Sequence, residues 1–195
     1  MFHPPQTMNA LLRRTACTLM TGVCLVLSTP SHAEANRDQL TLSNWLKFVP
    51  AAGAAAYSTY EGDYRGLLQL GTEVVVTVAA TQGLKEAFKN GDWGTRPDGG
   101  TKSFPSGHTS FACSGAAYLG ERYGWQEAAP AYAISAWVAY IRVNEDKHYV
   151  RDVVAGCALA WGISKFIVKP YVPAQVSVTP VIGPGQVGLN VSANW

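Results

Sequence analysis

The spacing between His148 and Asp152 suits a histidine that acts as a nucleophile on an electrophile such as phosphorus. His148 lies four residues before Asp152, so on a helix the two side chains would share one face. A carboxylate at that distance can accept the proton of one ring nitrogen, which leaves the other nitrogen free to attack. A capping or surface pair would show the same spacing. A metal site is less favoured, because Arg142, Lys147 and Arg151 crowd the segment with positive charge and the sequence offers no other ligand cluster.

A second histidine, His108, follows Pro105, Ser106 and Gly107 at the expected start of a helix. The first N–H groups of a helix have no partner within it and create a positive potential that suits an anion. Gly107 would let the backbone approach that anion closely. The alternative is an ordinary helix cap at Ser106, with His108 as a surface residue.

Two cations, one just before a glycine-rich loop and one within it, suggest that the anion is a phosphate. Lys89 ends an apolar segment and Arg96 lies in the loop that follows it. Arginine offers a planar fork for phosphate oxygens and lysine a point charge. Taken alone, the pair is better explained as two solvated side chains.

Together, these groups contain what phosphoryl transfer requires: a nucleophile, an acid for the leaving oxygen, and cations for the phosphate oxygens. A serine hydrolase that used Ser106, His148 and Asp152 is a rival interpretation. It is less favoured because the chain has no Gly-x-Ser-x-Gly elbow around Ser106 and the cations would remain unexplained.

The surrounding elements are expected to be helices. Apolar segments with helical boundaries cover residues 39–60 (with a kink at Pro50), 64–89, 105–124, 126–142 and 149–168. Residues 175–195 instead alternate around a Gly-Pro-Gly turn, which predicts a β-hairpin. We therefore expect an all-α bundle of about five mature helices with a short C-terminal β-hairpin. The predicted divisions are a signal peptide (1–33), a helical domain (34–170) and a hairpin extension (171–195).

The signal peptide is predicted from the order of residue types at the N-terminus. Arg13 and Arg14 precede an apolar run over 16–27, and small residues lead to a cut after Ala33. A retained membrane helix is the alternative, but the run is shorter than the roughly 20 residues that a span needs. Cleavage would leave Cys113 and Cys157, and the sequence favours neither a disulfide nor two buried thiols.

Composition excludes several classes of protein. Of the 195 residues, 48% are hydrophobic and only 14% are charged, which excludes a disordered chain and a coiled coil. Arg13 and Arg14 are the only charged residues before Glu34; removing them from 15 basic residues leaves 13, against 13 acidic ones. The mature chain is then neutral, so nucleic acid is not an expected partner. Contact with a membrane is left open, because Gln69, Glu73 and Lys165 interrupt the apolar segments.

The motifs resemble the three-part signature of the type 2 phosphatidic acid phosphatase superfamily. The matching residues are Lys89, Arg96 and Pro97; Pro105, Ser106, Gly107 and His108; and Arg142, His148 and Asp152. The resemblance implies that His148 is the nucleophile, Asp152 orients it and His108 is the general acid. It also implies that Lys89, Arg96, Ser106, Gly107 and Arg142 hold the phosphate, with no metal ion and no cofactor. One departure is Ile141, where the family usually has serine.

These expectations combine into one functional hypothesis. The chain is expected to be an exported, metal-independent phosphatase of the periplasm or cell envelope, acting on a lipid phosphate or a polyprenyl diphosphate through a phosphohistidine. A soluble periplasmic acid phosphatase for small phosphate esters is the main alternative. A non-catalytic envelope protein is a weaker one. The sequence predicts no oligomeric state.

Overall fold

The computed structural model describes residues 32–173, 175–183 and 186–194. Almost all of the predicted signal peptide, residues 1–33, therefore lies outside the described residues. The chain divides into two compact units, residues 1–35 and 36–195.

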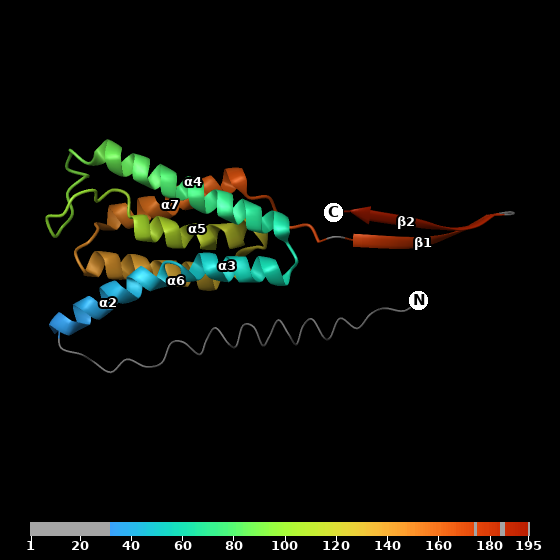
Figure 1. Ribbon diagram of the computed structural model, residues 1–195, viewed down its shortest axis with the longest axis horizontal. Helices are drawn as coiled ribbons and strands as arrows, with labels where there is room; N and C mark the ends of the chain where they lie inside the picture. Colours follow the sequence, from blue (N-terminus) through green and yellow to red (C-terminus); the bar gives the residue numbers. More distant parts are fainter. Residues whose placement is uncertain (1–31, 174, 184–185, 195) are drawn as a thin grey trace. The chain divides into compact units, whose positions relative to one another are not determined.

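The second unit is a helical bundle built around one central helix. Its helices are α2 (His32–Leu46, shared with the first unit), α3 (Val49–Tyr60), α4 (Tyr64–Phe88), α5 (Gly107–Arg122), α6 (Trp125–Asn144) and α7 (Val150–Ile167). Figure 1 shows α5 between α4 and α7 on one side and α3 and α6 on the other. Helices α6 and α7 each pack extensively along α5 but touch each other little. The predicted helical bundle is confirmed.

The first predicted helix is two helices in the structure. The chain leaves α2 at Leu46 and restarts α3 at Val49, with Phe48 as its N-cap residue. Pro50 lies in the first turn of α3, where the missing N–H of proline removes no hydrogen bond. Pro50 thus begins a helix rather than kinking one, and the end of α2 is free to lie beside the motif residues.

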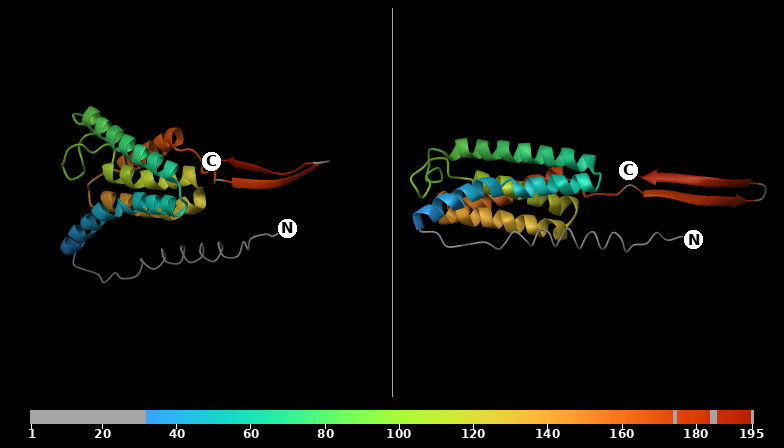
Figure 2. Two further views of the ribbon diagram at one scale, coloured as in Figure 1. Left: turned by 45° about the vertical axis from the view of Figure 1, so that its right-hand side comes forward. Right: turned by 60° about the horizontal axis from the view of Figure 1, so that its bottom comes forward.

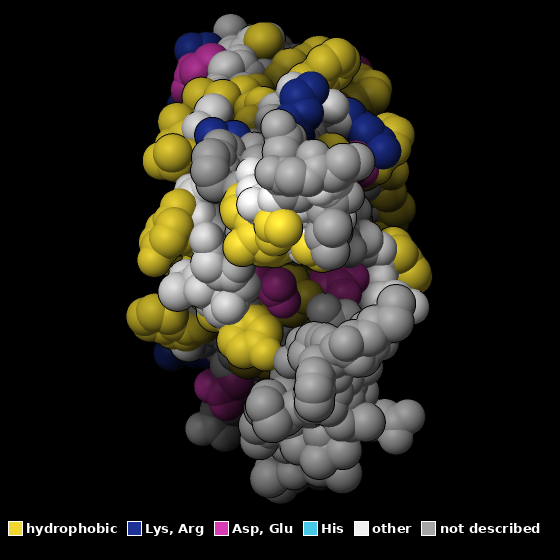
Figure 3. Space-filling model, turned by 90° about the vertical axis from the view of Figure 1, so that its right-hand side faces the viewer, with side chains coloured by type: hydrophobic (Ala, Val, Ile, Leu, Met, Phe, Trp, Pro, Cys, Tyr) yellow, Lys and Arg dark blue, Asp and Glu magenta, His cyan; other side chains and the backbone are white. Residues whose placement is uncertain are grey.

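Helix α4 buries polar side chains and exposes apolar ones, the reverse of a helix on the surface of a soluble protein. Its buried residues include four polar ones at a spacing of four, namely Glu73, Thr77, Thr81 and Lys85. Its exposed residues include the apolar Leu68, Val75, Val76 and Val78. By length and composition alone, α4 is the one helix in the described part of the chain that could cross a membrane. Figure 3, a space-filling view from one end of the molecule, also shows hydrophobic side chains, in yellow, at the outer edges of the surface.

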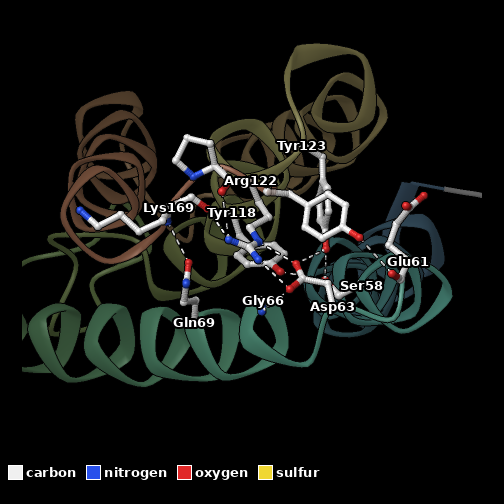
Figure 4. A network of polar contacts seen from close by, with 11 residues as sticks. Ser58, Glu61, Asp63, Gly66, Gln69, Tyr118, Arg122, Tyr123 and Lys169 are labelled. Carbon is white, nitrogen blue, oxygen red and sulfur yellow. Dashed lines mark hydrogen bonds and ion pairs between the residues drawn. The ribbon is translucent and has the colours of Figure 1, made fainter. Parts of the chain in front are cut away.

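A buried ion pair holds the bundle together at the end where α4 begins (Figure 4). Arg122 Nη2 donates to Asp63 Oδ1 at 2.6 Å, and Tyr123 Oη donates to Asp63 Oδ2 at 2.8 Å. Arg122 Nη1 also donates to the backbone oxygen of Lys169, just after α7. Burial acts to raise the pKa of Asp63, but the hydrogen bonds from Arg122 and Tyr123 hold that pKa below its usual range. The network ties the turn before α4 to the ends of α5 and α7.

The predicted C-terminal hairpin is confirmed. Strands β1 (Gln175–Gly183) and β2 (Gln186–Asn194) pair antiparallel, with Val178 opposite Val191. Figure 2 shows the two strands as one extended ribbon. In the described part of the chain, these strands contact each other and no helix.

Cys113 and Cys157, whose pairing the sequence did not decide, form a disulfide. Cys113 on α5 and Cys157 on α7 have Cα atoms 5.2 Å apart. The bond joins the helices that carry His108 and Asp152. It lies a turn or more beyond those residues, so it fixes the spacing of the two helices below the candidate site.

Candidate functional site

His148 and Asp152 form the centre of the site, at the start of α7. Both are buried, with 2% and 0% of their surfaces exposed. The Nδ1 atom of His148 lies 3.4 Å from Asp152 Oδ2 and has no other partner among the described residues. This geometry leaves Nε2 as the nitrogen free to attack.

Asp152 is held in place by three residues. Its Oδ2 atom accepts hydrogen bonds from the hydroxyl of Ser103 and from the backbone N–H of Tyr149 at 3.1 Å. Its backbone oxygen accepts from the N–H of Ser106 at 2.9 Å. The start of α7 is thereby fixed to the segment that leads into α5. The two helices approach so closely that a Cβ on Gly156 would lie 2.7 Å from the Ser106 oxygen.

Burial, together with the neighbouring cations, determines the protonation of His148. Burial and the charges of Lys85 and Arg142 lower the pKa of His148 to about 3. An imidazole with that pKa is neutral near pH 7. A neutral imidazole has the lone pair that nucleophilic attack requires.

His108 lies at the start of α5 and contacts α2. Its Nε2 atom is 2.7 Å from Asn44 Oδ1. Burial, followed by the charges of Arg142 and Lys47, lowers the pKa of His108 to about 3. The charge of His148 also contributes to that shift, so the two histidines lie near each other.

Ser106 and Gly107 form the N-terminus of α5. Ser106 is the N-cap residue and is fully buried, and its Oγ accepts from the N–H of Thr109 at 3.4 Å. Gly107 is the first helical residue. The predicted helix start is therefore present, with free N–H groups next to His108.

Arg142 and Arg96 are two arginines whose charges lower the pKa of both histidines. Arg142 is buried and its Nη1 lies 3.5 Å from Ser43 Oγ. Burial and the charge of Arg96 lower the pKa of Arg142 to about 10. The buried Nε atoms of both arginines have no partner among the described residues. Donors left free in this way suit an anionic ligand.

The loop that carries Arg96 is anchored to the turn before His148. Lys147 Nζ lies 2.8 Å from Asp98 Oδ2, and the N–H of Asp98 donates to the oxygen of Asp146. Arg151 Nη2 also donates to the oxygen of Asp92 in the same loop at 3.2 Å.

The structure places Lys85, rather than Lys89, with the other cations. Lys89 pairs with Glu86 at 3.1 Å, and both side chains are about half exposed, at 46% and 51%. Lys85 is buried, and its Nζ donates to the backbone oxygens of Lys102 and Ser103. Burial and the charge of Arg96 lower the pKa of Lys85 to about 8. The buried polar stripe of α4 was the signal in the sequence that could have identified Lys85.

Other residues of the site were not predicted from the sequence, namely Ser43, Asn44, Lys47 and Ser103. Three of them come from the end of α2 or just after it, and no motif marks them. No group of three or more metal-ligating side chains occurs in the described part of the chain. The site therefore combines two neutral histidines with a set of cations and free N–H groups, an arrangement that can bind and cleave a phosphate ester.

Comparison with known proteins leads to the same chemistry. Residues 67–174 match the PAP2 superfamily. A lipid A 4'-phosphatase of Helicobacter pylori (strain J99) is 31% identical over 163 residues, which cover 77% of this chain and 82% of the relative. A lipid A 1-phosphatase of the same strain is 24% identical over 159 residues, covering 78% and 83%. No solved structure gave a significant match.

Proposed function

This chain belongs to the PAP2 superfamily and is a phosphatase, and we propose that it removes phosphate from a lipid of the cell envelope through a phosphohistidine. The observation that carries the proposal is the position of His148. Its buried, neutral ring has one nitrogen beside Asp152 and the other free, next to cations from three separate segments.

The first chemical step is displacement at phosphorus. Nε2 of His148 forms a bond to phosphorus while the bond from phosphorus to the leaving oxygen breaks. Asp152 stabilises the positive charge that develops on the ring. His108 donates a proton to the leaving oxygen, and the lipid departs as an alcohol, or as a monophosphate if the substrate is a diphosphate. Water then attacks the phosphohistidine with His108 as the base, which releases phosphate and restores His148.

The low pKa of His108 in the free protein fits the role of acid once substrate is bound. Arg142 and Lys47 contribute to that low value. A bound phosphate neutralises these charges, so the pKa of His108 rises and the ring can take up a proton. Asn44 then orients the imidazole.

Arg96, Arg142 and the start of α5 at Ser106 and Gly107 bind the phosphate oxygens. We assign the lysine of this set to Lys85 instead of Lys89. Lys85 lies close enough to Arg96 and His148 for their charges to interact. Together these groups stabilise the charge on the equatorial oxygens in the transition state.

The substrate is inferred from the relatives and from α4. Both relatives are lipid A phosphatases by name, which favours lipid A or a similar phosphorylated lipid over a polyprenyl diphosphate. The exposed apolar residues of α4 favour contact with a membrane. The predicted signal would place the site on the exported side, in the periplasm. A soluble periplasmic acid phosphatase remains the second candidate.

The test is phosphate release by the purified full chain in EDTA, from lipid A in detergent and from 4-nitrophenyl phosphate. We expect metal-independent release from both, with a higher kcat/KM on lipid A, and no release by His148→Ala. Activity that required zinc, or that survived in His148→Ala, would contradict the proposal. A preference for the soluble ester would favour the acid phosphatase.

A further inference from the structure

An open groove runs along the surface between α6 and α7, with α5 as its floor. It exists because the two outer helices pack on α5 rather than on each other. Its cavity volume is about 390 Å³. On α6 the small side chains of Ala136 and Ala139 keep it open, and Trp125 and Tyr132 line its far part.

The surface that the groove exposes is apolar. Three hydroxyl residues line it, namely Thr109, Tyr132 and Ser135, but none of them exposes polar surface to it. Thr109 Oγ1 donates to Ser106 Oγ, and Ser135 Oγ donates to the oxygen of Ala131. No Lys, Arg, Asp or Glu is among its described lining residues. Such a surface favours an apolar ligand over a polar one.

Each of the three helices connects this groove to the candidate site. Thr109 follows His108 on α5, and Val153 follows Asp152 on α7. On α6, Ala139 lies three residues before Arg142, which puts both on one side of the helix. The lining of the groove therefore comes within one helical turn of His108, Asp152 and Arg142. From Ala139 back to Trp125 it extends on the order of 20 Å, at 1.5 Å per helical residue.

We propose that this groove binds an acyl chain of the substrate while its phosphate occupies the site. The inference rests on the proposed function and adds a location for the apolar part of the lipid. The distribution of charge supports an acyl chain as the ligand. The cations lie at the end of the groove near the site, and the described lining residues of the groove carry no charge. A phosphorylated lipid has the same division, with the anion at one end and a long apolar chain behind it.

Kinetics with monoalkyl phosphates of increasing chain length, below their micelle concentrations, test the proposal. In the wild-type chain, kcat/KM should rise by roughly fourfold for each methylene that the groove buries. Ala139→Leu and Ala136→Trp should fill the groove and remove this rise, with little change for the shortest phosphate. Ala133→Trp, on an exposed position outside the groove, is the matched control and should behave like wild type.

Three results would overturn the chain-binding site. One is an unchanged chain-length dependence in both filled variants. Another is an equal loss on short and long phosphates, which would mean that filling damages the site itself. The third is a change of oligomeric state on filling, which would identify a second copy of this chain as the occupant.

A binding measurement separates this inference from the proposed function. A long-chain alkyl phosphonate that carries bromine on its chain should quench the fluorescence of Trp125. Trp125→Phe and Ala136→Trp should each reduce that quenching. If the wild-type chain hydrolyses no alkyl phosphate but shows this quenching, the proposed function fails and the groove is supported. If the ligand causes no quenching, or if the quenching does not depend on Trp125, the proposal that the groove binds the chain is overturned.

Discussion

The side chain of Lys85 packs against Gly107: its Cε atom lies 3.6 Å from the point where a Cβ on Gly107 would be. This contact brings the end of α4 to the N-terminus of α5. It places a buried ammonium group beside free backbone N–H groups, a combination suited to a phosphate.

The first prediction concerns Lys85, in the last turn of α4, and Lys89, the residue that caps this helix. Lys85→Met should lower kcat/KM on lipid A by about a hundredfold, the size expected for loss of one transition-state donor. Lys89→Met should stay within about threefold of wild type, because an exposed ion pair contributes little. Steady-state kinetics of both variants, with circular dichroism as a check on folding, make the measurement. If both variants lost kcat/KM equally, the assignment of phosphate binding to Lys85 instead of Lys89 would be contradicted.

The second prediction concerns His108 and its partner Asn44. His108→Ala should reduce turnover most on an alkyl phosphate, whose poor leaving group needs protonation, and much less on 4-nitrophenyl phosphate. Asn44→Ala removes a 2.7 Å contact to Nε2 and should show the same selectivity with a smaller loss, about tenfold. Uniform losses on both substrates would make His108 a binding residue.

The third prediction concerns pH. Burial and the charges of Arg142 and Lys47 lower the pKa of His108 to about 3 in the free protein. Vanadate bound in the site would offset those charges, so the pKa should rise toward the ordinary value of about 6.5. NMR titration of the imidazole carbons, with and without vanadate and with His148→Ala to assign the signals, measures the change. A pKa unaffected by bound vanadate would contradict the proposed protonation.

The fourth prediction concerns the disulfide. Cys113 and Cys157 are 44 residues apart, and closing a loop of that length is worth roughly 4 kcal/mol in the chain-entropy model. Reduction should lower the midpoint of urea unfolding, with activity kept under native conditions. The Cys113→Ala/Cys157→Ala double variant controls for effects of the reductant elsewhere. An unfolding midpoint unaffected by reduction would contradict a stabilising cross-link.

Much of the fold could be predicted from the sequence because its helix boundaries are marked locally. Helix α5 begins at Ser106 and Gly107 as expected, and two paired strands lie before and after the position of the predicted turn. The division of the first helix at Lys47 and Phe48 was not predicted. Pro50 is compatible with both a kink and a first turn, and packing decides between them.

The candidate site was predicted less evenly. His148 lies two residues before α7 and Asp152 lies in the first turn of α7, so their short separation in the sequence is enough to bring them together. Lys85 and Lys89 are one turn apart, and only the packing of α4 on α5 shows which one is buried. Asn44 lies 64 residues from His108, and no local pattern indicates a contact over that distance.

The central claim is that His148 carries the phosphoryl group, and trapping that group tests it most directly. The full chain would be mixed with radiolabelled lipid phosphate, quenched within one turnover, digested and analysed by mass spectrometry. We predict one labelled peptide whose phosphate is stable to base, labile to acid and located on His148. Label on Ser106, or label that persists in His148→Ala, would contradict the claim.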